Sequence, residues 1–298
     1  MFHGVWPALT SPFRPDFSLD LSLFHEQVQY QVQAGVHGLI LAGTLGEASS
    51  LEAEEKIALF QAARQAAPQC PIAVNVAESS TARAVSFVKA LTDLGVDGFM
   101  LLPPMRYVSD EAETLAYFEA VVSATSKPIL LYNNPVDYKI EITDAIFARL
   151  CQFENVVAVK ESTRDMRNMT RLIHRYGERL SILCGVDNIA LESLVMGARG
   201  WVAGLVCAFP EETVAIYNLI QKGRLEEAKQ IYKWFLPLLD LDVSTKLVQN
   251  IKMATQAVGR GNDRVRPPRQ ALVGHEYDRV SQVIKEALAK RPRLEELV

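Results

Sequence analysis

Short apolar runs recur along the first two thirds of the chain, and they lack the polar alternation of a strand with one exposed face. The runs are 4–10, 38–43, 71–77, 98–104, 128–135, 156–162, 181–187 and 200–205. Parallel strands that are covered on both faces have this pattern, because neither face meets water. We therefore expect eight buried parallel strands.

Between these runs, apolar residues return at the spacing of an amphipathic helix. The helical segments are 21–34, 51–66, 81–94, 110–124, 143–151 and 166–176. Successive strands start 19 to 34 residues apart, which is the size of a βα unit. Eight such units predict a (β/α)8 TIM barrel. An open sheet that binds a dinucleotide would carry a glycine fingerprint after its first strand, and none is present.

After residue 205 the pattern becomes helical throughout, over 210–223, 224–242, 243–259 and 276–291. The first of these segments is expected to close the barrel as its eighth helix. We predict a barrel with the active site over residues 1–223 and a three-helix appendage over 224–298 that packs on it. The apolar segment 233–239 is expected to pack within the chain, with a partner chain as the alternative.

Composition excludes several classes of protein. The chain has 298 residues, with 31 basic and 35 acidic side chains, so neither nucleic acid nor an anionic membrane is an expected partner. The first residues lack a charged leader followed by an apolar core, and no apolar run reaches the roughly 20 residues of a membrane span. We expect a cytoplasmic protein. Its four cysteines form no CxxC pair and are interpreted as buried reduced thiols.

Polar residues gather where the expected strands end, which is where barrel enzymes place their chemistry. They are Thr10, Ser11, the GTLGE segment 43–47, Asn75, Glu78, Arg106, Tyr107, Tyr132, Asn133, Asn134, Lys160, Glu161, Ser162, Asp187 and Asn188. The five histidines (His3, His25, His37, His174 and His275) fall outside this set, which disfavours a metal-dependent aldolase.

Lys160 stands out because it ends an apolar strand. Alternation places it on one face with Ala158 and Val156. If that face is the barrel interior, burial lowers the pKa of the amine, and a neutral amine attacks carbonyl carbons to form a Schiff base. A lysine that reaches into water, or that pairs with Glu161, is the alternative.

Two further features favour Schiff-base chemistry. Tyr132 ends the neighbouring strand, and a phenol there can move protons beside an imine; a tyrosine that only packs its ring is the alternative. In the GTLGE segment, Gly43 and Gly46 allow a tight turn, and the helix that follows offers free N–H groups to an anion such as a carboxylate.

Together these motifs resemble the Schiff-base aldolase and lyase family of dihydrodipicolinate synthase and N-acetylneuraminate lyase. GTLGE (43–47), YNNP (132–135), VAVKES (157–162) and CGVD (184–187) match its motifs in order and spacing. The resemblance implies an imine between Lys160 and a 2-oxo acid, a proton relay by Tyr132 that Thr44 orients, and a homotetramer built as a dimer of dimers. It implies no cofactor. Candidate substrate-binding residues are Gly43, Leu45, Glu78, Arg106, Asn134, Ser162 and Gly204.

Departures from the family pattern separate its branches. Leu45 replaces a hydroxyl residue, and Asp137 falls near an arginine that holds a second carboxylate in dihydrodipicolinate synthases. Those enzymes also lend a tyrosine across a subunit interface, at a position that Met105 or Arg106 occupies here beside Tyr107.

In the segments 102–114, 132–143, 159–162 and 234–252, the chain more closely resembles the deaminases of hydroxyproline breakdown. Those enzymes convert pyrroline-4-hydroxy-2-carboxylate into 2-oxoglutarate semialdehyde. In that reaction Glu78, Asn134 or Ser162 would lie near the departing hydroxyl. Three alternatives stay open: a pyruvate-dependent aldolase of a 2-keto-3-deoxy sugar acid, a 4-hydroxy-tetrahydrodipicolinate synthase, and a catalytically silent sensor on the same fold.

Overall fold

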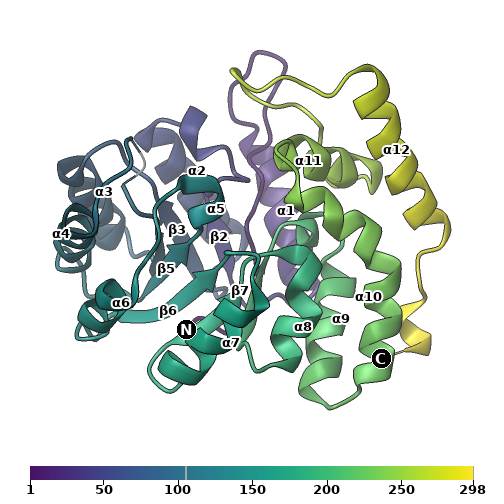
Figure 1. Ribbon diagram of the computed structural model, residues 1–298. Helices are drawn as coiled ribbons and strands as arrows, with labels where there is room; N and C mark the ends of the chain where they lie inside the picture. The colour runs from purple at the N-terminus through teal and green to yellow at the C-terminus, as the bar shows by residue number, and fades with distance from the viewer. Residues whose placement is uncertain (105, 298) are drawn as a thin grey trace.

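A barrel of eight parallel strands forms the centre of the computed structural model, which describes residues 1–104 and 106–297 (Figure 1). The strands are β1 (Gly4–Pro7), β2 (Leu39–Leu41), β3 (Ile72–Val76), β4 (Gly98–Leu101), β5 (Ile129–Asn133), β6 (Val156–Glu161), β7 (Ser181–Cys184) and β8 (Gly200–Ala203). Each pairs with its sequence neighbour, β1 pairs with β8, and a bridge from Ala8 to Ile40 joins β1 to β2. The predicted TIM barrel is confirmed.

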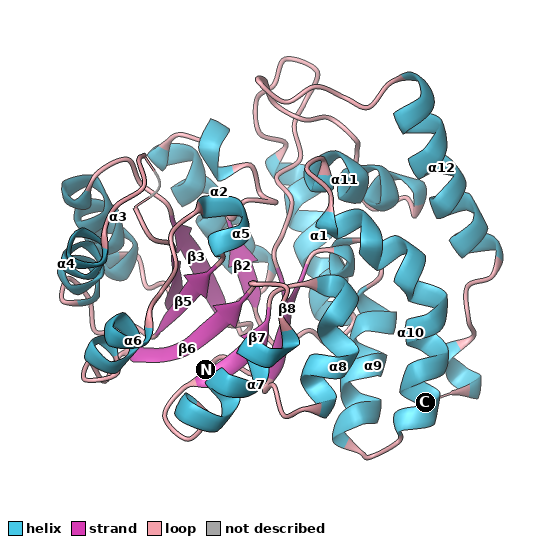
Figure 2. Cartoon of the chain, viewed as in Figure 1, coloured by secondary structure: helices cyan, strands magenta, loops and turns pink. Residues whose placement is uncertain are grey.

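Helices cover the outside of the barrel (Figure 2). They are α1 (Leu21–Gln33), α2 (Ala53–Ala66), α3 (Thr81–Asp93), α4 (Glu111–Val122), α6 (Asp144–Leu150), α7 (Met166–Tyr176), α8 (Ala190–Val195) and α9 (Pro210–Gln221), with a short α5 (Pro135–Tyr138) after β5. The hydrophobic pattern did not indicate α5 or α8. Both are shorter than two helical turns, so neither carries a repeat long enough to reveal a period.

Three more helices follow: α10 (Leu225–Leu239), α11 (Leu247–Ala257) and α12 (Gly274–Ala289). Helix α10 packs against α9, and α12 lies on the outer side of α10 and α11 (Figure 1). The apolar segment 233–239 contacts its own chain: the Trp234 and Phe235 rings both lie 5.6 Å from the ring of Phe209. The Trp234 indole also donates to the Ala287 carbonyl at 2.8 Å. A 3-10 turn, η4 (Asp240–Val243), joins α10 to α11.

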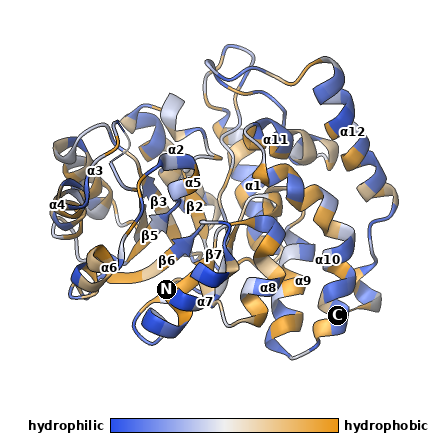
Figure 3. Cartoon of the chain, viewed as in Figure 1, coloured by the Kyte–Doolittle hydropathy of each residue, from blue (hydrophilic) through white to orange (hydrophobic). Residues whose placement is uncertain are grey.

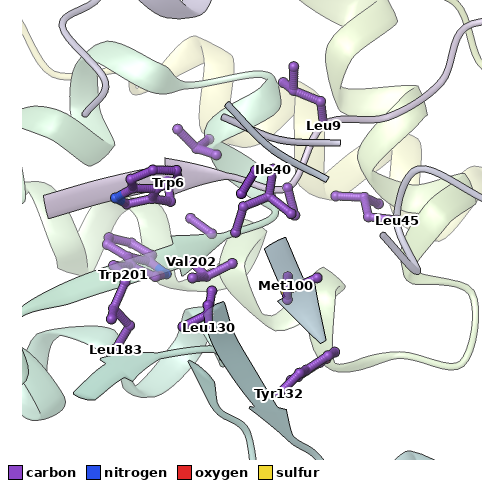
Figure 4. Packing of buried hydrophobic residues seen from close by; sticks show 14 of the residues in the cluster. Trp6, Leu9, Ile40, Leu45, Met100, Leu130, Tyr132, Leu183, Trp201 and Val202 are labelled. Carbon is purple, nitrogen blue, oxygen red and sulfur yellow. The ribbon is translucent and has the colours of Figure 1, made fainter. Parts of the chain in front are cut away.

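Strand register decides which side chains enter the barrel. Met100 pairs with Leu130, and Tyr132 pairs with Lys160. Figure 4 shows Met100, Leu130 and Tyr132 in the buried cluster between the strands. The register shifts by one residue between Ile129 and Leu130 on β5. Val156 pairs with Ile129 and Ala158 with Leu130, so Val157 has no partner on β5 and the regular pairing back from Lys160 extends only to Ala158.

The helices outside the barrel are amphipathic, and polar and apolar bands alternate along them (Figure 3). In the described part of the chain, no helix has both the length and the apolar character needed to span a bilayer. The four cysteines are free thiols; Cys184 and Cys207 are buried, whereas Cys70 and Cys151 are only partly buried.

Candidate active site

A pocket opens at the carboxyl ends of the strands and is closed on one side by η4. Its lining comprises Ala8, Gly43, Thr44, Leu45, Met100, Tyr132, Asn134, Asp137, Tyr138, Lys160, Ser162, Arg164, Gly185, Val186, Val202, Ala203, Gly204, Asp242, Val243 and Leu247. These residues come from seven of the eight strands or the loops after them, together with the C-terminal region. The pocket thus joins segments far apart in the sequence.

Lys160 extends into this pocket from the end of β6 and is only 7% exposed. Its amine lies 4.0 Å from the centre of the Tyr132 ring and forms no ion pair within residues 1–104 and 106–297. Glu161, the alternative partner, accepts from the Asn133 amide at 2.9 Å and from the Thr163 N–H instead. Burial lowers the pKa of Lys160, which increases the fraction of neutral, nucleophilic amine.

The Tyr132 ring lies directly against this amine. Its hydroxyl accepts a hydrogen bond from the Asn134 side-chain amide at 3.1 Å. Burial raises the pKa of Tyr132 to about 12, so the phenol keeps its proton at neutral pH. A protonated phenol beside a nucleophilic amine can donate to an oxygen or nitrogen on the attacked carbon.

The resemblance implied that Thr44 orients Tyr132, but the two side chains form no direct hydrogen bond in the structure. The Thr44 hydroxyl hydrogen-bonds the hydroxyl of Tyr138. Tyr138 in turn packs edge-on against Tyr132, with ring centres 5.6 Å apart. The physical reason is α5, a single helical turn that begins after Asn134 and carries Tyr138 back over the strand ends. Thr44 thus acts on Tyr132 only through Tyr138.

Gly43, Thr44 and Leu45 line the pocket as the loop after β2. The backbone N–H groups of Thr44 and Leu45 donate no hydrogen bond to any described residue. The expected helix dipole does not contribute, because a 3-10 turn (Ala48–Ser50) intervenes and α2 begins only at Ala53. The loop itself therefore offers the donors that a carboxylate would need.

Three other predicted residues lie in the lining. Asn134 bonds Tyr132 and also Asp137, at 2.8 Å. Ser162 donates to the Gly185 carbonyl at 3.1 Å. Gly204 is present as well, but its N–H already donates to both carboxylate oxygens of Asp187 at 3.1 Å and is not available to a ligand.

Glu78 and Arg106 lie elsewhere, which corrects their assignment to the substrate pocket. The Glu78 carboxylate pairs with the Lys56 amine of α2 at 2.6 Å. Arg106 is exposed and, with Glu78, borders a separate cavity formed mainly by α2 and α3. Both residues follow strand ends, but their loops turn outward to the helices. Met105 lies outside the described residues.

The pocket also holds groups that the sequence analysis did not assign. Tyr138 is one; Arg164 is another, and it bridges Asp137 at 3.3 Å. Asp242 reaches the pocket from η4, 39 residues after Ala203, the last pocket residue of β8. The phenol one turn after Asn134 was a local signal for Tyr138. Nothing local marks Asp242, because only the packing of the C-terminal helices brings it there.

Gly185 makes room for Lys160. A Cβ atom at this position would lie 2.6 Å from Cγ and 2.7 Å from Cε of Lys160, and 2.2 Å from Oγ of Ser162. We expect Gly185→Ala to displace the amine and to slow imine formation with pyruvate by about 100-fold. The measurement is the rate of borohydride trapping, with the urea midpoint as a control for folding. An unchanged trapping rate would show that Lys160 does not depend on this space.

Within the described residues, no cluster of three or more histidine, cysteine, aspartate or glutamate side chains is arranged to bind a metal ion. What the pocket does combine is a buried amine, a protonated phenol and a loop of free N–H groups. This combination can capture a carbonyl-type carbon next to a carboxylate.

Comparisons with known proteins agree with this chemistry. The model of the dihydrodipicolinate synthetase family matches residues 1–287. A 4-hydroxy-tetrahydrodipicolinate synthase of Geotalea daltonii is 27% identical over 290 residues, covering 96% of this chain and 99% of the relative. The enzyme of the same name from Archaeoglobus fulgidus is 29% identical, covering 96% and 98%. The 4-hydroxy-tetrahydrodipicolinate synthase structure from Methylacidiphilum fumariolicum SolV superposes with a TM-score of 0.91 at 28% identity, covering 97% and 98%.

Proposed function

Because the chain belongs to the dihydrodipicolinate synthetase family and is a lyase of the Schiff-base class I aldolase type, we propose that it deaminates and dehydrates pyrroline-4-hydroxy-2-carboxylate. Lys160 is the proposed nucleophile and Tyr132 the proposed proton carrier. Thr44 would position Tyr138 against Tyr132, and the Thr44 and Leu45 N–H groups would bind the substrate carboxylate.

The charge of the pocket is the observation that carries the choice of substrate. A substrate with a second carboxylate needs an unpaired cation, yet Asp137 occupies the region after YNNP. Arg164 is the one arginine among the described residues of the lining, and Asp137 bridges it. Asp242 adds a further acid. The lining therefore favours a substrate with one carboxylate and a basic nitrogen.

The proposed reaction balances with Lys160 as the only covalent group. Its amine adds to C2, and the C2–N bond of the ring breaks with the electron pair passing to nitrogen. The new imine acidifies C3; loss of that proton and of the C4 hydroxyl releases water. Tautomerisation moves the double bond to C5, where water displaces ammonia. A second water frees the product from Lys160, so the net reaction consumes one water and yields ammonia and 2-oxoglutarate semialdehyde.

The test is to incubate the purified protein with this imino acid and to measure ammonia with glutamate dehydrogenase. We expect equal amounts of ammonia and semialdehyde, and no ammonia from the Lys160→Met variant. Release of pyruvate from a 2-keto-3-deoxy sugar acid, with no ammonia from the imino acid, would contradict the proposal and identify an aldolase.

The names of the relatives favour a second candidate, 4-hydroxy-tetrahydrodipicolinate synthase. The same set of substrate assays distinguishes the synthase from the deaminase. Formation of 4-hydroxy-tetrahydrodipicolinate without release of ammonia would identify the synthase. If no reaction is seen for any of the three activities and pyruvate forms no adduct, the protein is better explained as a catalytically silent sensor.

A homotetramer, as a dimer of dimers, is proposed alongside this function. Its support is the exposed apolar pair Tyr107 and Val108, which are 59% and 70% exposed in the single chain. Such side chains are common at subunit interfaces. Since Tyr138 of the same chain already bonds Thr44, the proposed relay does not need Tyr107 from a partner. A cytoplasmic location stays a prediction.

A further inference from the structure

Asp242 is held in the pocket by a rigid turn. In η4, the carboxylate of Asp240 accepts from the Asn188 amide at 2.8 Å, and the Leu241 carbonyl accepts from the Asn250 amide at 3.0 Å. These bonds tie the turn to the 3-10 turn after β7 (Asp187–Ile189) on one side and to α11 on the other. The Asp242 side chain consequently has a fixed origin at the pocket wall.

The residue that faces Asp242 across the pocket wall is a glycine, Gly204. A Cβ atom on Gly204 would lie 2.5 Å from Oδ1 of Asp242, so the carboxylate fills the space that a side chain would take. The Gly204 N–H bonds Asp187 rather than Asp242. The space beside Gly204, directly after β8, is thus filled by an acid from the C-terminal region.

No lysine, arginine or histidine among residues 1–104 and 106–297 forms a salt bridge with Asp242. The other acid in the lining, Asp137, is occupied by Arg164 and Asn134. Burial and the neighbouring Asp187 raise the pKa of Asp242 well above its ordinary value, and the Lys160 amine opposes this shift, so Asp242 and Lys160 lie close enough to interact. A carboxylate without a cationic partner, facing a pocket, is suited to a cationic ligand group.

We propose that Asp242 binds the basic nitrogen of the substrate, so that the pocket selects a cyclic imino acid or amino acid over a carboxylate ring without nitrogen. This inference rests on the proposed function and identifies the residue that recognises the substrate's nitrogen. The ring nitrogen is attached to C2, the carbon that Lys160 attacks, so its partner must lie close to that amine. During ring opening Asp242 would take the proton that the attacking amine loses and pass it to the departing nitrogen.

The test uses two competitors of the same ring size against borohydride trapping of pyruvate on the full chain. 4-Hydroxyproline carries a carboxylate and a ring ammonium, whereas cyclopentanecarboxylate carries only the carboxylate. We expect the wild type to bind 4-hydroxyproline at least about tenfold more tightly, as a charged hydrogen bond would produce. The Asp242→Asn variant should lose that preference, which is measured in each protein as the ratio of the two inhibition constants, so that a change in the rate of pyruvate trapping itself cancels.

Asp240→Asn is the matched control, since it removes a negative charge from the same turn but outside the pocket lining, while its side-chain oxygen can still accept the bond from Asn188; it should keep the preference. If Asp242→Asn also keeps it, or if the wild type shows no preference, the inference is overturned. The ammonia assay separates the two proposals. Ammonia release by wild type and Asp242→Asn at equal kcat and KM would refute the role of Asp242 and leave the deaminase standing. A preference lost only in Asp242→Asn, with no ammonia from any form, would refute the deaminase alone.

Discussion

Replacing Lys160 with methionine is expected to abolish turnover, with a loss on the order of 10^4-fold or more, as for other enzymes that lose their nucleophile. Methionine has similar length and no amine, so it fills the space beside Tyr132 without attacking a carbon. The measurements are ammonia release and the mass of the protein after borohydride reduction with pyruvate. We expect one adduct on the wild type and none on the variant.

The pH dependence of trapping adds a second test of the same residue. Burial lowers the pKa of Lys160 below the ordinary value of 10.5. Because only the neutral amine attacks, the rate of imine formation should rise with pH and level off below pH 10.5. For an exposed lysine, the trapping rate would level off near the ordinary pKa of 10.5 instead.

Lys222→Met, which changes an exposed lysine at the end of α9, is the matched control and should trap pyruvate like the wild type. If Lys160→Met still gains the adduct, then another amine forms the imine and the proposed site is wrong. If Lys160→Met loses the adduct but the wild-type trapping rate levels off only near pH 10.5, then Lys160 forms the imine but burial does not lower its pKa.

Much of this architecture could be predicted because it is encoded locally. Each strand is a short apolar run, each long helix has a readable period, and parallel strands bring their carboxyl ends to one face. Lys160 and Tyr132 end neighbouring strands, and the β5–β6 register pairs them directly. No knowledge of packing beyond the strand order was needed to expect these two side chains together.

The errors share a physical cause. Glu78 and Arg106 also follow strand ends, but the direction of a loop side chain depends on the helices beside it, and Lys56 draws Glu78 outward. Tyr138 and Asp242 enter the pocket through a short helix and a turn whose positions depend on tertiary packing. Periodicity describes elements, whereas a loop acid such as Asp242 is placed by contacts such as Asn250 to Leu241.

A buried ion pair joins the GTLGE loop to the C-terminal region, and its disruption should give the largest loss of stability. The carboxylate of Glu47 bonds the Lys252 amine of α11, with side chains 0% and 1% exposed. It also accepts from the Arg266 N–H at 3.0 Å. Burial lowers the pKa of Lys252 to about 8, which leaves the amine mostly protonated at neutral pH.

We expect Lys252→Met to lower the free energy of unfolding by about 3–5 kcal/mol, because it leaves the buried Glu47 carboxylate with only the longer ion pair to Arg269 at 3.9 Å. Urea unfolding at neutral pH measures this loss. The double variant Glu47→Gln, Lys252→Met should lose less, since no unpaired charge remains. Lys229→Met breaks an exposed pair with Glu226 and should cost about 0.5 kcal/mol or less.

The same substitution should reach the active site, because Glu47 belongs to the loop that carries the free N–H groups. The Glu47 N–H donates to the Thr44 carbonyl at 3.1 Å, so a displaced Glu47 loosens the turn that presents Thr44 and Leu45. We therefore expect Lys252→Met to raise KM for the carboxylate substrate, under conditions where the variant is folded, while Lys229→Met leaves KM unchanged. A variant that is destabilised but keeps the wild-type KM would show that the ion pair supports the fold alone, and that β2 and Gly46 suffice to hold the loop.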